Sequence, residues 1–338
     1  MGLTALSRAQ ILAHRRRVAP LDLRLPAGGG SLRRAAWAGL QDSMPRAAVL
    51  SIHARVQNAT PNVWEDDSFV QVWGPRFSTY VIPAEDVAVF TLGRLPDDPK
   101  RQAEFQAVAD KLERFLDGRR MTLSEAGHAL GVHPSSLRYG GPTGRILIRW
   151  EGARSPVLWT VPAPDVDPFE ARLELARRYL HVFGPGTAAA FEVWAGIRSP
   201  RGKAAFEALK RELVAVTTPL GESWILASDE ASLRGPADEP APARLLPSGD
   251  TFYLLQGKDR ELLVPDAKRR AELWTSRVWP GAVLVEGEIA GIWRRAGPTV
   301  TIETWRRLSQ PEREAVEREA ESFPLPDIDR PIRVSWQD

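Results

Sequence analysis

The chain has 338 residues, enough for about two or three packed domains, and its 43% hydrophobic and 26% charged content is typical of a globular protein. No apolar run approaches the ~20 residues that span a bilayer, and the sequence begins without a signal-peptide core, so we expect a cytoplasmic protein. The absence of cysteine excludes disulfides and thiolate metal sites, and five scattered histidines do not form a zinc motif, so we expect no metal or other cofactor.

The net charge of +2 conceals a basic N-terminal segment. Residues 1–60 contain nine arginines, no lysine and two aspartates, a net charge of +7, so the remaining residues sum to −5. Arginine binds phosphate oxygens through a planar fork of N–H donors, and this segment therefore favours a nucleic-acid partner. The alternative is a charged face in solvent, which is the commoner reason for a run of like charges.

Residues 1–98 read as a first winged-helix module. Ser7 is a predicted N-cap for a helix through Val18, and Gly28–Gly30 interrupts the chain before a second helix. That helix is expected to run from Ser31 to Leu40, which would place Gln41 at its end, and Pro45 would start a third helix. The strands predicted for the wing are Phe69–Trp73 and Ser78–Ile82.

Residues 99–165 predict a second module, with a helix over 102–116 and a wing formed by strands 145–150 and 157–161. Between them, residues 122–137 have the pattern of a helix-turn-helix, in which Thr122 and Glu125 form a capping box. We interpret this module as a scaffold. The alternative is that residues 134–139 form a helix that reads bases.

Residues 166–228 predict a third module, and a linker rich in proline, alanine and acidic residues follows over 229–243. The third module has predicted helices over 169–183 and 203–213, a helix between them, and strands 213–217 and 223–227. Residues 244–338 are expected to be mostly β, with one helix over 311–322 and strands over 251–255, 261–264, 282–286, 289–294, 300–303 and 332–336. The predicted class is therefore α+β, with three tandem winged-helix modules and a small C-terminal β-rich region.

Three short motifs in the first module resemble the signature of the AlkZ-like winged-helix DNA glycosylases. That signature reads Gly-Leu-Gln-x-Gln-x-Pro-x-Ala-Ala, then Leu-Trp-Ala-Arg, then Trp-x-x-Arg-Gly-Thr-x-His-x-x-Pro-Ala-Glu-Asp. The corresponding residues here are Gly39-Leu40-Gln41-Asp42-Ser43-x-Pro45-x-Ala47-Ala48, Ile52-His53-Ala54-Arg55, and Trp73-x-x-Arg76-Phe77-Ser78-x-Tyr80-x-x-Pro83-Ala84-Glu85-Asp86. Later elements match as well, including Gly184-Pro185-Gly186-Thr187 and Ile292-Trp293-Arg294-Arg295. The resemblance thus extends over nearly the whole chain.

The resemblance implies a monofunctional glycosylase that hydrolyses the N-glycosidic bond of purines alkylated at N7 or N3. A cationic alkylated base is a good leaving group, so the enzyme has to position a water and stabilise an oxocarbenium-like sugar. Gln41 is the residue implied to orient that water through its amide. Ser43, the second candidate catalytic residue, stands where the signature has Gln or Asp, and its shorter hydroxyl reaches the same water only if the backbone moves closer. Either Gln41 holds the water with a substitute such as Asp42, the third candidate, or hydrolysis is lost.

The resemblance and the basic residues together predict the contacts with DNA. The candidate DNA-binding residues are Arg15, Arg16, Arg17, Arg33, Arg34, Arg55, Arg76, Ser78 and Tyr80. Three of the wing positions depart from the signature, since Tyr80 replaces a His, Phe77 replaces a Gly and Ser78 replaces a Thr. Phe77 would either narrow a lesion pocket or simply pack.

Three functions remain open at this point. The leading hypothesis is a monomeric, nucleoid-associated DNA glycosylase whose partner is damaged duplex DNA. The second is a DNA-binding or lesion-recognition protein of the same fold without glycosylase activity, which the changes at Ser43, Phe77 and Tyr80 suggest. The third is a helical scaffold for protein interactions.

Overall fold

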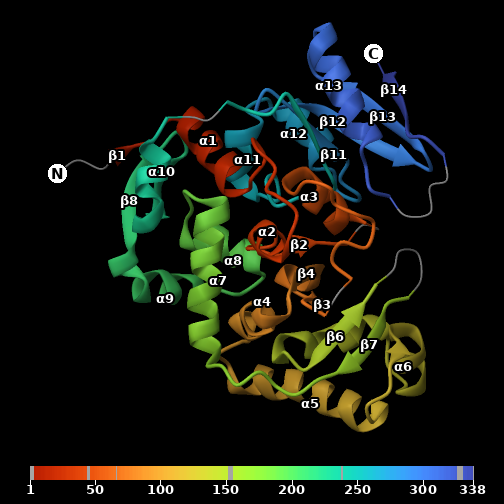
Figure 1. The fold of residues 1–338 in the computed structure, drawn as a ribbon. Coiled ribbons are helices and arrows are strands. Elements are labelled where there is room, and N and C mark those ends of the chain that lie inside the picture. Colours follow the sequence, from red (N-terminus) through yellow and green to blue (C-terminus); the bar gives the residue numbers. More distant parts are fainter. Residues whose placement is uncertain are drawn as a thin grey trace.

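The computed structural model describes residues 4–43, 46–65, 67–150, 155–236, 239–325 and 330–337. Strands in these ranges form three sheets, with helices packed around them (Figure 1). Residues 288–321 and 333–337, drawn in blue, lie at one end of the molecule, and residues 99–149 and 157–160, drawn in yellow, lie at the other (Figure 1). The red and orange segment that carries the Gln41 motif lies between these ends. The mixed α+β class agrees with the sequence, while the number of winged-helix modules stays a prediction.

The first helix, α1 (Arg8–Val18), begins where the sequence indicates. The Ser7 hydroxyl accepts a hydrogen bond from the backbone N–H of Gln10, and the Gln10 side chain accepts one from Ser7, which completes a capping box. The predicted second helix is shorter than expected: α2 spans Gly29–Ala35 and does not reach Leu40. The third helix, α3, spans Ala47–Arg55, and its predicted start at Pro45 lies outside the described residues.

Strands of the first two predicted modules join in one six-stranded sheet, in the order β2-β4-β3-β6-β7-β5. The strands are β2 (Leu40–Gln41), β3 (Phe69–Trp73), β4 (Thr79–Pro83), β5 (Met121–Thr122), β6 (Ile146–Arg149) and β7 (Val157–Thr160). Both predicted wings are therefore present as antiparallel pairs, β3 with β4 and β6 with β7. One register pair, Gln71 with Ile148, connects β3 to β6 across the middle of the sheet.

Helices cover this sheet and connect its two halves. They are α4 (Val87–Thr91), α5 (Pro99–Leu116) and α6 (Leu123–Ala129), with 3-10 segments η1 (Pro75–Phe77), η2 (Ala84–Asp86), η3 (Leu92–Arg94) and η4 (Pro134–Thr143). The predicted capping box of Thr122 and Glu125 is present at the start of α6. Buried Leu112 and Leu116 of α5 pack with Ile146, Ile148 and Leu158 of the sheet in one core.

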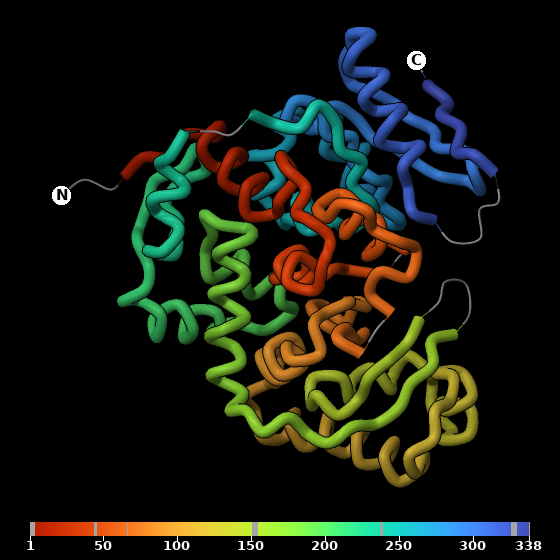
Figure 2. The backbone as a smooth tube through the Cα atoms, viewed as in Figure 1, coloured from red at the N-terminus to blue at the C-terminus, as the bar shows by residue number. Residues whose placement is uncertain are grey.

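The third predicted module contains a second, smaller sheet. Its helices are α7 (Pro168–Phe183), α8 (Ala188–Ala195) and α9 (Arg201–Ala208), followed by 3-10 segment η5 (Lys210–Glu212) and the antiparallel strands β8 (Leu213–Thr218) and β9 (Gly221–Leu226). The N-terminal strand β1 (Thr4–Ala5) pairs in parallel with β8, so the beginning of the chain lies beside residues more than two hundred positions away (Figure 2). Thr187 caps α8, as its place after the Gly-Pro-Gly turn suggests.

The predicted linker is not wholly irregular. It contains 3-10 segment η6 (Ala227–Asp229) and helix α10 (Glu230–Arg234). Asp229 accepts a hydrogen bond from His181 at 2.9 Å, and Arg17 of α1 donates to the Ser232 carbonyl at 2.8 Å. These contacts attach the segment to α7 and α1, which explains why a stretch rich in alanine and acidic residues is ordered.

The C-terminal region forms a five-stranded sheet in the order β10-β11-β12-β13-β14. The strands are β10 (Ala243–Leu246), β11 (Gly281–Val285), β12 (Glu288–Ala296), β13 (Thr299–Thr304) and β14 (Arg333–Gln337), and α13 (Gln310–Glu321) packs against them. Two predicted strands are wrong. Residues 251–255 form turns and loop, and residues 261–264 lie mostly in helix α11 (Arg260–Leu263), which follows 3-10 segment η7 (Gly257–Asp259) and precedes α12 (Ala267–Leu273).

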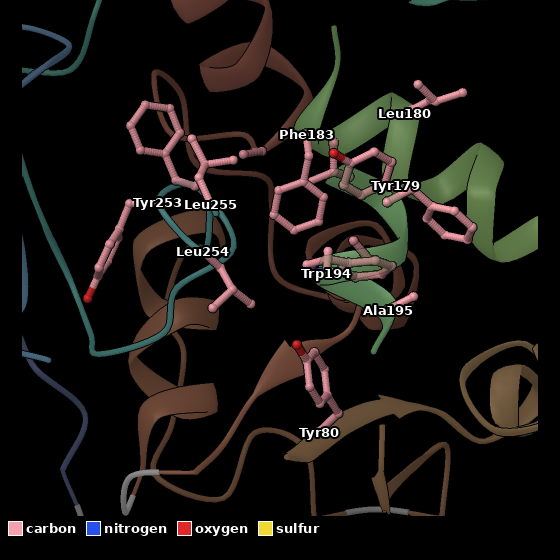
Figure 3. Close-up of a cluster of buried hydrophobic side chains, with 14 of the residues drawn as sticks. Tyr80, Tyr179, Leu180, Phe183, Trp194, Ala195, Tyr253, Leu254 and Leu255 are labelled. Carbon is pink, nitrogen blue, oxygen red and sulfur yellow. The ribbon is translucent and has the colours of Figure 1, made fainter. Parts of the chain in front are cut away.

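The largest core contains residues of all these parts. Figure 3 shows Tyr80 of β4 below Trp194 of α8, with Tyr179 and Phe183 of α7 above them. Phe183 and Trp194 have ring centroids 5.2 Å apart, and both side chains are buried. Leu254 and Leu255 of the C-terminal region belong to the same core, so this region is packed onto the Gln41 segment rather than attached by a free linker.

Candidate active site

Gln41 lies on a strand, which corrects its predicted place at the end of a helix. Helix α2 ends at Ala35, the chain turns at Gly39 (φ +70°), and Gln41 of β2 then pairs with Tyr80 of β4. A Cβ atom at Gly39 would lie 2.9 Å from both Phe90 and Tyr80, so the turn requires glycine for space as well as for its φ. The strand pairing fixes the backbone of Gln41 against the wing.

The Gln41 side chain lies between the β3–β4 turn and the C-terminal region. Arg76 Nη2 donates a long hydrogen bond, 3.4 Å, to Gln41 Oε1. On the other side the backbone of Gly249 is so close that a Cβ atom there would lie 3.0 Å from Gln41 Nε2. In the described part of the chain this amide oxygen accepts no other side-chain hydrogen bond, so it has acceptor capacity left for a water.

Asp42 is not brought together with the Gln41 amide. It is buried, and its two carboxylate oxygens accept hydrogen bonds from the backbone N–H of Ala48 at 2.9 Å and from Gln71 Nε2 at 2.7 Å. Burial raises the pKa of Asp42 to about 6, although these two hydrogen bonds oppose the rise. Asp42 therefore anchors the first turn of α3 to strand β3.

Ser43 and Ser78 are both half-buried near this motif. Ser43 follows Gln41 by two positions and ends the described segment before α3. The carbonyl of Ser78 accepts a hydrogen bond from Gly74 N–H at 2.9 Å, which closes the β3–β4 turn.

Tyr80 is fully buried, in contrast to its predicted contact with DNA. Its ring lies against Gly39 and Gly74 and stacks on Phe90 at a centroid distance of 6.4 Å. Burial raises the pKa of the Tyr80 phenol, which is therefore neutral at physiological pH. In the described residues, neither the Tyr80 hydroxyl nor Arg76 Nη1 has a hydrogen-bond partner, although both atoms are buried.

Arg55 is also buried and forms an ion pair inside the protein. Its Nη1 and Nη2 atoms donate to the two oxygens of Asp250, each at 2.7 Å, and Ser51 donates to the same carboxylate at 2.6 Å. The side chains of Arg55 and Asp250 are 1% and 0% exposed. This bidentate pair joins α3 to the C-terminal region, and no face of Arg55 is left for a phosphate.

The three arginines of α1 that were predicted to bind phosphate also contact groups of the protein itself. Arg15 is buried and donates to the carbonyls of Phe183 and Gly184 at the end of α7. Arg16 pairs with Asp22 at 2.8 Å, and Arg17 donates to the carbonyls of Ser232 and Pro236. The structure thus uses these arginines to attach α1 to its neighbours.

Arg33 and Arg34 are the exposed members of the predicted set. Arg33 is paired with Glu85 at 3.2 Å, and both side chains are about half exposed, at 49% and 62%. Arg34 is exposed on α2. These two residues and Arg76 are the predicted DNA contacts whose positions remain compatible with that function.

An open cavity of about 370 Å³ lies on the C-terminal side of the motif. Ala47 of α3, Ser248, Trp279 and Arg294 are among its lining residues. Ser248 precedes Gly249, the glycine that packs against the Gln41 amide, although Gln41 itself does not line the cavity. Its wall also includes Val278, which is 51% exposed. A mixed apolar and cationic wall suits a planar organic ligand next to a phosphate.

Sequence reasoning missed the residues that support the motif from a distance. Gln71 was not singled out, although it binds Asp42, and the pairing of Asp250 with Arg55 was not predicted. No local pattern predicts either contact, because each one joins segments that are far apart in the sequence. A buried carboxylate as partner for Arg55 would have been recognisable only from the fold.

The described residues contain neither a candidate metal site nor a helix that could span a membrane. No group of three or more His, Asp or Glu side chains in these ranges could hold a metal ion. No helix in the same ranges is long and apolar enough to cross a membrane.

Comparison with known proteins connects this geometry to one family. Residues 34–324 match the family described as DNA glycosylase AlkZ-like. Among solved structures, the fold is similar to that of the DNA glycosylase AlkZ of Streptomyces sahachiroi, with a TM-score of 0.79 and 17% sequence identity. That similarity covers 98% of this chain and 100% of the other. No curated protein matches the sequence.

Proposed function

The chain belongs to the AlkZ-like DNA glycosylases, a family of DNA-repair hydrolases, and we propose that it hydrolyses the N-glycosidic bond of a purine alkylated at N7 or N3. The proposed partner is damaged duplex DNA, bound by one copy of the chain. The observation that carries the proposal is the Gln41 amide, which is held between Arg76 and Gly249 with its oxygen free to accept from a water.

In the proposed reaction Gln41 Oε1 accepts a hydrogen bond from the water and directs a water lone pair at C1′. The bond between C1′ and the base nitrogen breaks, and its electron pair leaves with the base, which changes from a cation to a neutral molecule. The water oxygen bonds to C1′ of the oxocarbenium-like sugar, and the water loses one proton to solvent. The products are the free base and an abasic site, and orientation of the water is the main contribution of the protein.

Arg76 and the cavity beside Ser248 complete this proposal. Arg76 is cationic and makes no ion pair with any residue that the structure describes, so its guanidinium is suited to a DNA phosphate next to the lesion. We assign the cavity of about 370 Å³ to the alkylated base, because its wall is partly apolar and includes Ser248, which precedes the glycine that packs against Gln41. Arg33 and Arg34 would contact phosphates farther along the duplex.

The test compares the wild-type protein with Gln41→Ala on duplex oligonucleotides that contain 7-methylguanine or 3-methyladenine. Strand scission at abasic sites measures release of the base. We expect the variant to lose about a hundredfold or more in rate, as misplacing a reacting group does. Gln310→Ala, which removes an exposed glutamine of α13, is the matched control. Equal rates for Gln41→Ala and Gln310→Ala would rule out the assigned role of Gln41.

A DNA-binding protein without hydrolysis is the second candidate, and Ser43 is the observation that favours it. The family signature has a longer amide side chain at this position, two residues after Gln41, and a serine hydroxyl reaches less far. If the wild type binds alkylated DNA without releasing a base while Ser43→Gln releases it, the second candidate is correct. If the wild type releases the base, it is excluded.

A further inference from the structure

The β3–β4 turn has two consecutive residues in the left-handed region, Arg76 (φ +54°) and Phe77 (φ +59°). Residues other than glycine rarely adopt this backbone conformation, and the family signature has glycine where Phe77 stands. The turn places the two side chains differently: Arg76 reaches Gln41, while Phe77 lines a separate cavity. A residue other than glycine in this unfavourable backbone conformation suggests that its side chain has a function, and here that side chain is Phe77.

The cavity beside Phe77 has a volume of about 210 Å³ and an aromatic wall. Phe105 of α5 and Tyr139 of η4 stack with an interplanar angle of 14°, and Phe77 meets Tyr139 edge-on at a centroid distance of 5.3 Å. Tyr139 is 41% exposed, which is unusual for a large aromatic residue in a packed cluster. The guanidinium of Arg138 lies 5.8 Å from the Phe77 ring centroid and 5.6 Å from that of Tyr139, so the exposed part of Tyr139 is where the aromatic wall is open to a ligand.

The rest of the cavity wall is basic. Arg94, Arg101, Arg198 and Arg201 line it, and no carboxylate does. Arg201 is 3.4 Å from Asp97, which also pairs with Arg172 at 2.8 Å. The other three lining arginines form no ion pair within the ranges that the structure describes. Arg94 is buried, donates to the carbonyls of Ala195 and Trp73, and holds its guanidinium 4.8 Å from the centre of the Phe77 ring. Arg94 therefore supports the aromatic wall, and Arg101 and Arg198 are the lining arginines with neither an ion pair nor burial in the described residues.

We propose that the cavity formed by Phe77, Phe105, Tyr139 and the four arginines binds one unpaired nucleotide, with its base on the aromatic wall and its phosphate on the arginines. Aromatic stacking combined with arginine is the chemistry by which proteins hold single-stranded nucleic acid. The cavity volume of about 210 Å³ is below the ~300–1,000 Å³ of sites for drug-sized ligands. The cavity therefore has room for no more than one nucleotide. This inference rests on the proposed function in one respect: that function identifies the nucleotide as part of a DNA strand close to the lesion.

The test uses undamaged DNA, so that it does not depend on glycosylase activity. Binding of a short fluorescent oligothymidylate is measured by anisotropy at several salt concentrations. We expect Phe77→Leu to weaken binding about fivefold or more, because a stacked base is lost, and Phe77→Tyr to bind like the wild type. Arg101→Ala/Arg198→Ala should lower the slope of log K against log salt by about 0.7, because the variant loses the contact with one phosphate and each phosphate contact on a single strand contributes about that amount.

A charge-matched control is Arg114→Ala/Arg211→Ala, which removes two exposed arginines outside the cavity. Equal losses in the two double variants would overturn the proposal, since binding would then follow net charge alone. Phe77→Gly separates binding from folding. It relieves the positive φ, so we expect an unchanged or higher melting temperature together with weaker binding. Wild-type affinity in Phe77→Gly would also overturn the proposal.

Competition distinguishes the possible sources of the nucleotide. If thymidine monophosphate displaces the fluorescent oligothymidylate only at a much higher concentration than unlabelled oligothymidylate does, the site binds a DNA strand. Displacement at similar concentrations supports the site but assigns it to a free nucleotide. Inorganic phosphate that competes as well as thymidine monophosphate would overturn the role of the aromatic wall.

Discussion

Two groups of arginines in this molecule differ in what faces them. The basic segment of residues 1–60 is the obvious candidate for DNA binding, yet Arg15, Arg16 and Arg55 are buried and donate hydrogen bonds to carbonyls or carboxylates of the protein. The arginines around Phe77 are scattered in the sequence, between residues 94 and 201, and line an open cavity that no carboxylate lines. The first group holds helices together. In the second group Arg94 donates to carbonyls of the protein and Arg201 lies near Asp97, while Arg101 and Arg198 make no ion pair in the described residues and are available to a ligand.

The difference shows that a run of like charges in a sequence does not locate a binding surface. A guanidinium can cross-link a fold as well as bind a phosphate, because both use the same fork of N–H donors. Which of the two it does depends on carboxylates and helix ends brought near it by the fold. The following variants test the division, beginning with the largest expected effect.

Arg55→Ala should destabilise the protein by about 3–5 kcal/mol, because it leaves the buried Asp250 carboxylate without its partner. The free energy of unfolding, measured by urea denaturation, gives the effect. Arg33→Ala, in the same basic segment but exposed, is the control. Unchanged stability in Arg55→Ala would contradict the structural role of Arg55, and with it the distinction between the two groups of arginines.

Asp42→Asn should remove a pH dependence of stability. Burial raises the pKa of Asp42 from 3.8 to about 6, so the folded state retains a proton that the unfolded chain has lost, and stability falls as pH rises between these values. Relative to Asp42→Asn, the wild type should therefore lose up to about 3 kcal/mol between pH 4 and pH 7. His14 and His53, whose pKa values burial lowers to about 4 and about 3, act in the opposite direction, but they cancel in this difference. A difference that is constant with pH would contradict the prediction.

Arg33→Ala should have the smallest effect on folding, within about 1 kcal/mol, because its ion pair with Glu85 is exposed. If Arg33 binds a phosphate, the same variant lowers the salt dependence of duplex binding by about one unit of slope. Denaturation and anisotropy on one preparation measure both. A large loss of stability with unchanged binding would assign Arg33 to the structural group.

Local patterns predicted much of the fold. Ser7 and Thr122 start their helices with the expected capping boxes, and both strand pairs of the central sheet lie close to their predicted positions. These features depend on contacts a few residues apart, which a sequence displays directly. The two wrong strands, over 251–255 and 261–264, are apolar runs too short to distinguish a buried strand from a buried turn or helix.

The candidate site was predictable only in part. The motif residues Gln41 and Arg76 do lie in contact, but the helix expected before Gln41 ends early, because Gly39 turns the chain. The burial of Tyr80 and Arg55 could not be predicted, since it depends on packing with Phe90 and on Asp250, which lies 195 residues after Arg55. The cavity beside Phe77 is likewise assembled from segments that no motif connects.

Gln71 has a consequence for how the protein opens. It is 1% exposed, its amide nitrogen donates to Asp42, and its amide oxygen accepts from the backbone N–H of Trp150 at 2.6 Å. It also supplies the single register pair between the two halves of the six-stranded sheet. We therefore expect native-state amide exchange to resolve two cooperative units that meet at this residue, with the unit of β5, β6 and β7 opening at a lower free energy than the unit of β2, β3 and β4. Gln71 thus joins the half of the sheet that carries Gln41, strands β2, β3 and β4, to the half formed by strands β5, β6 and β7.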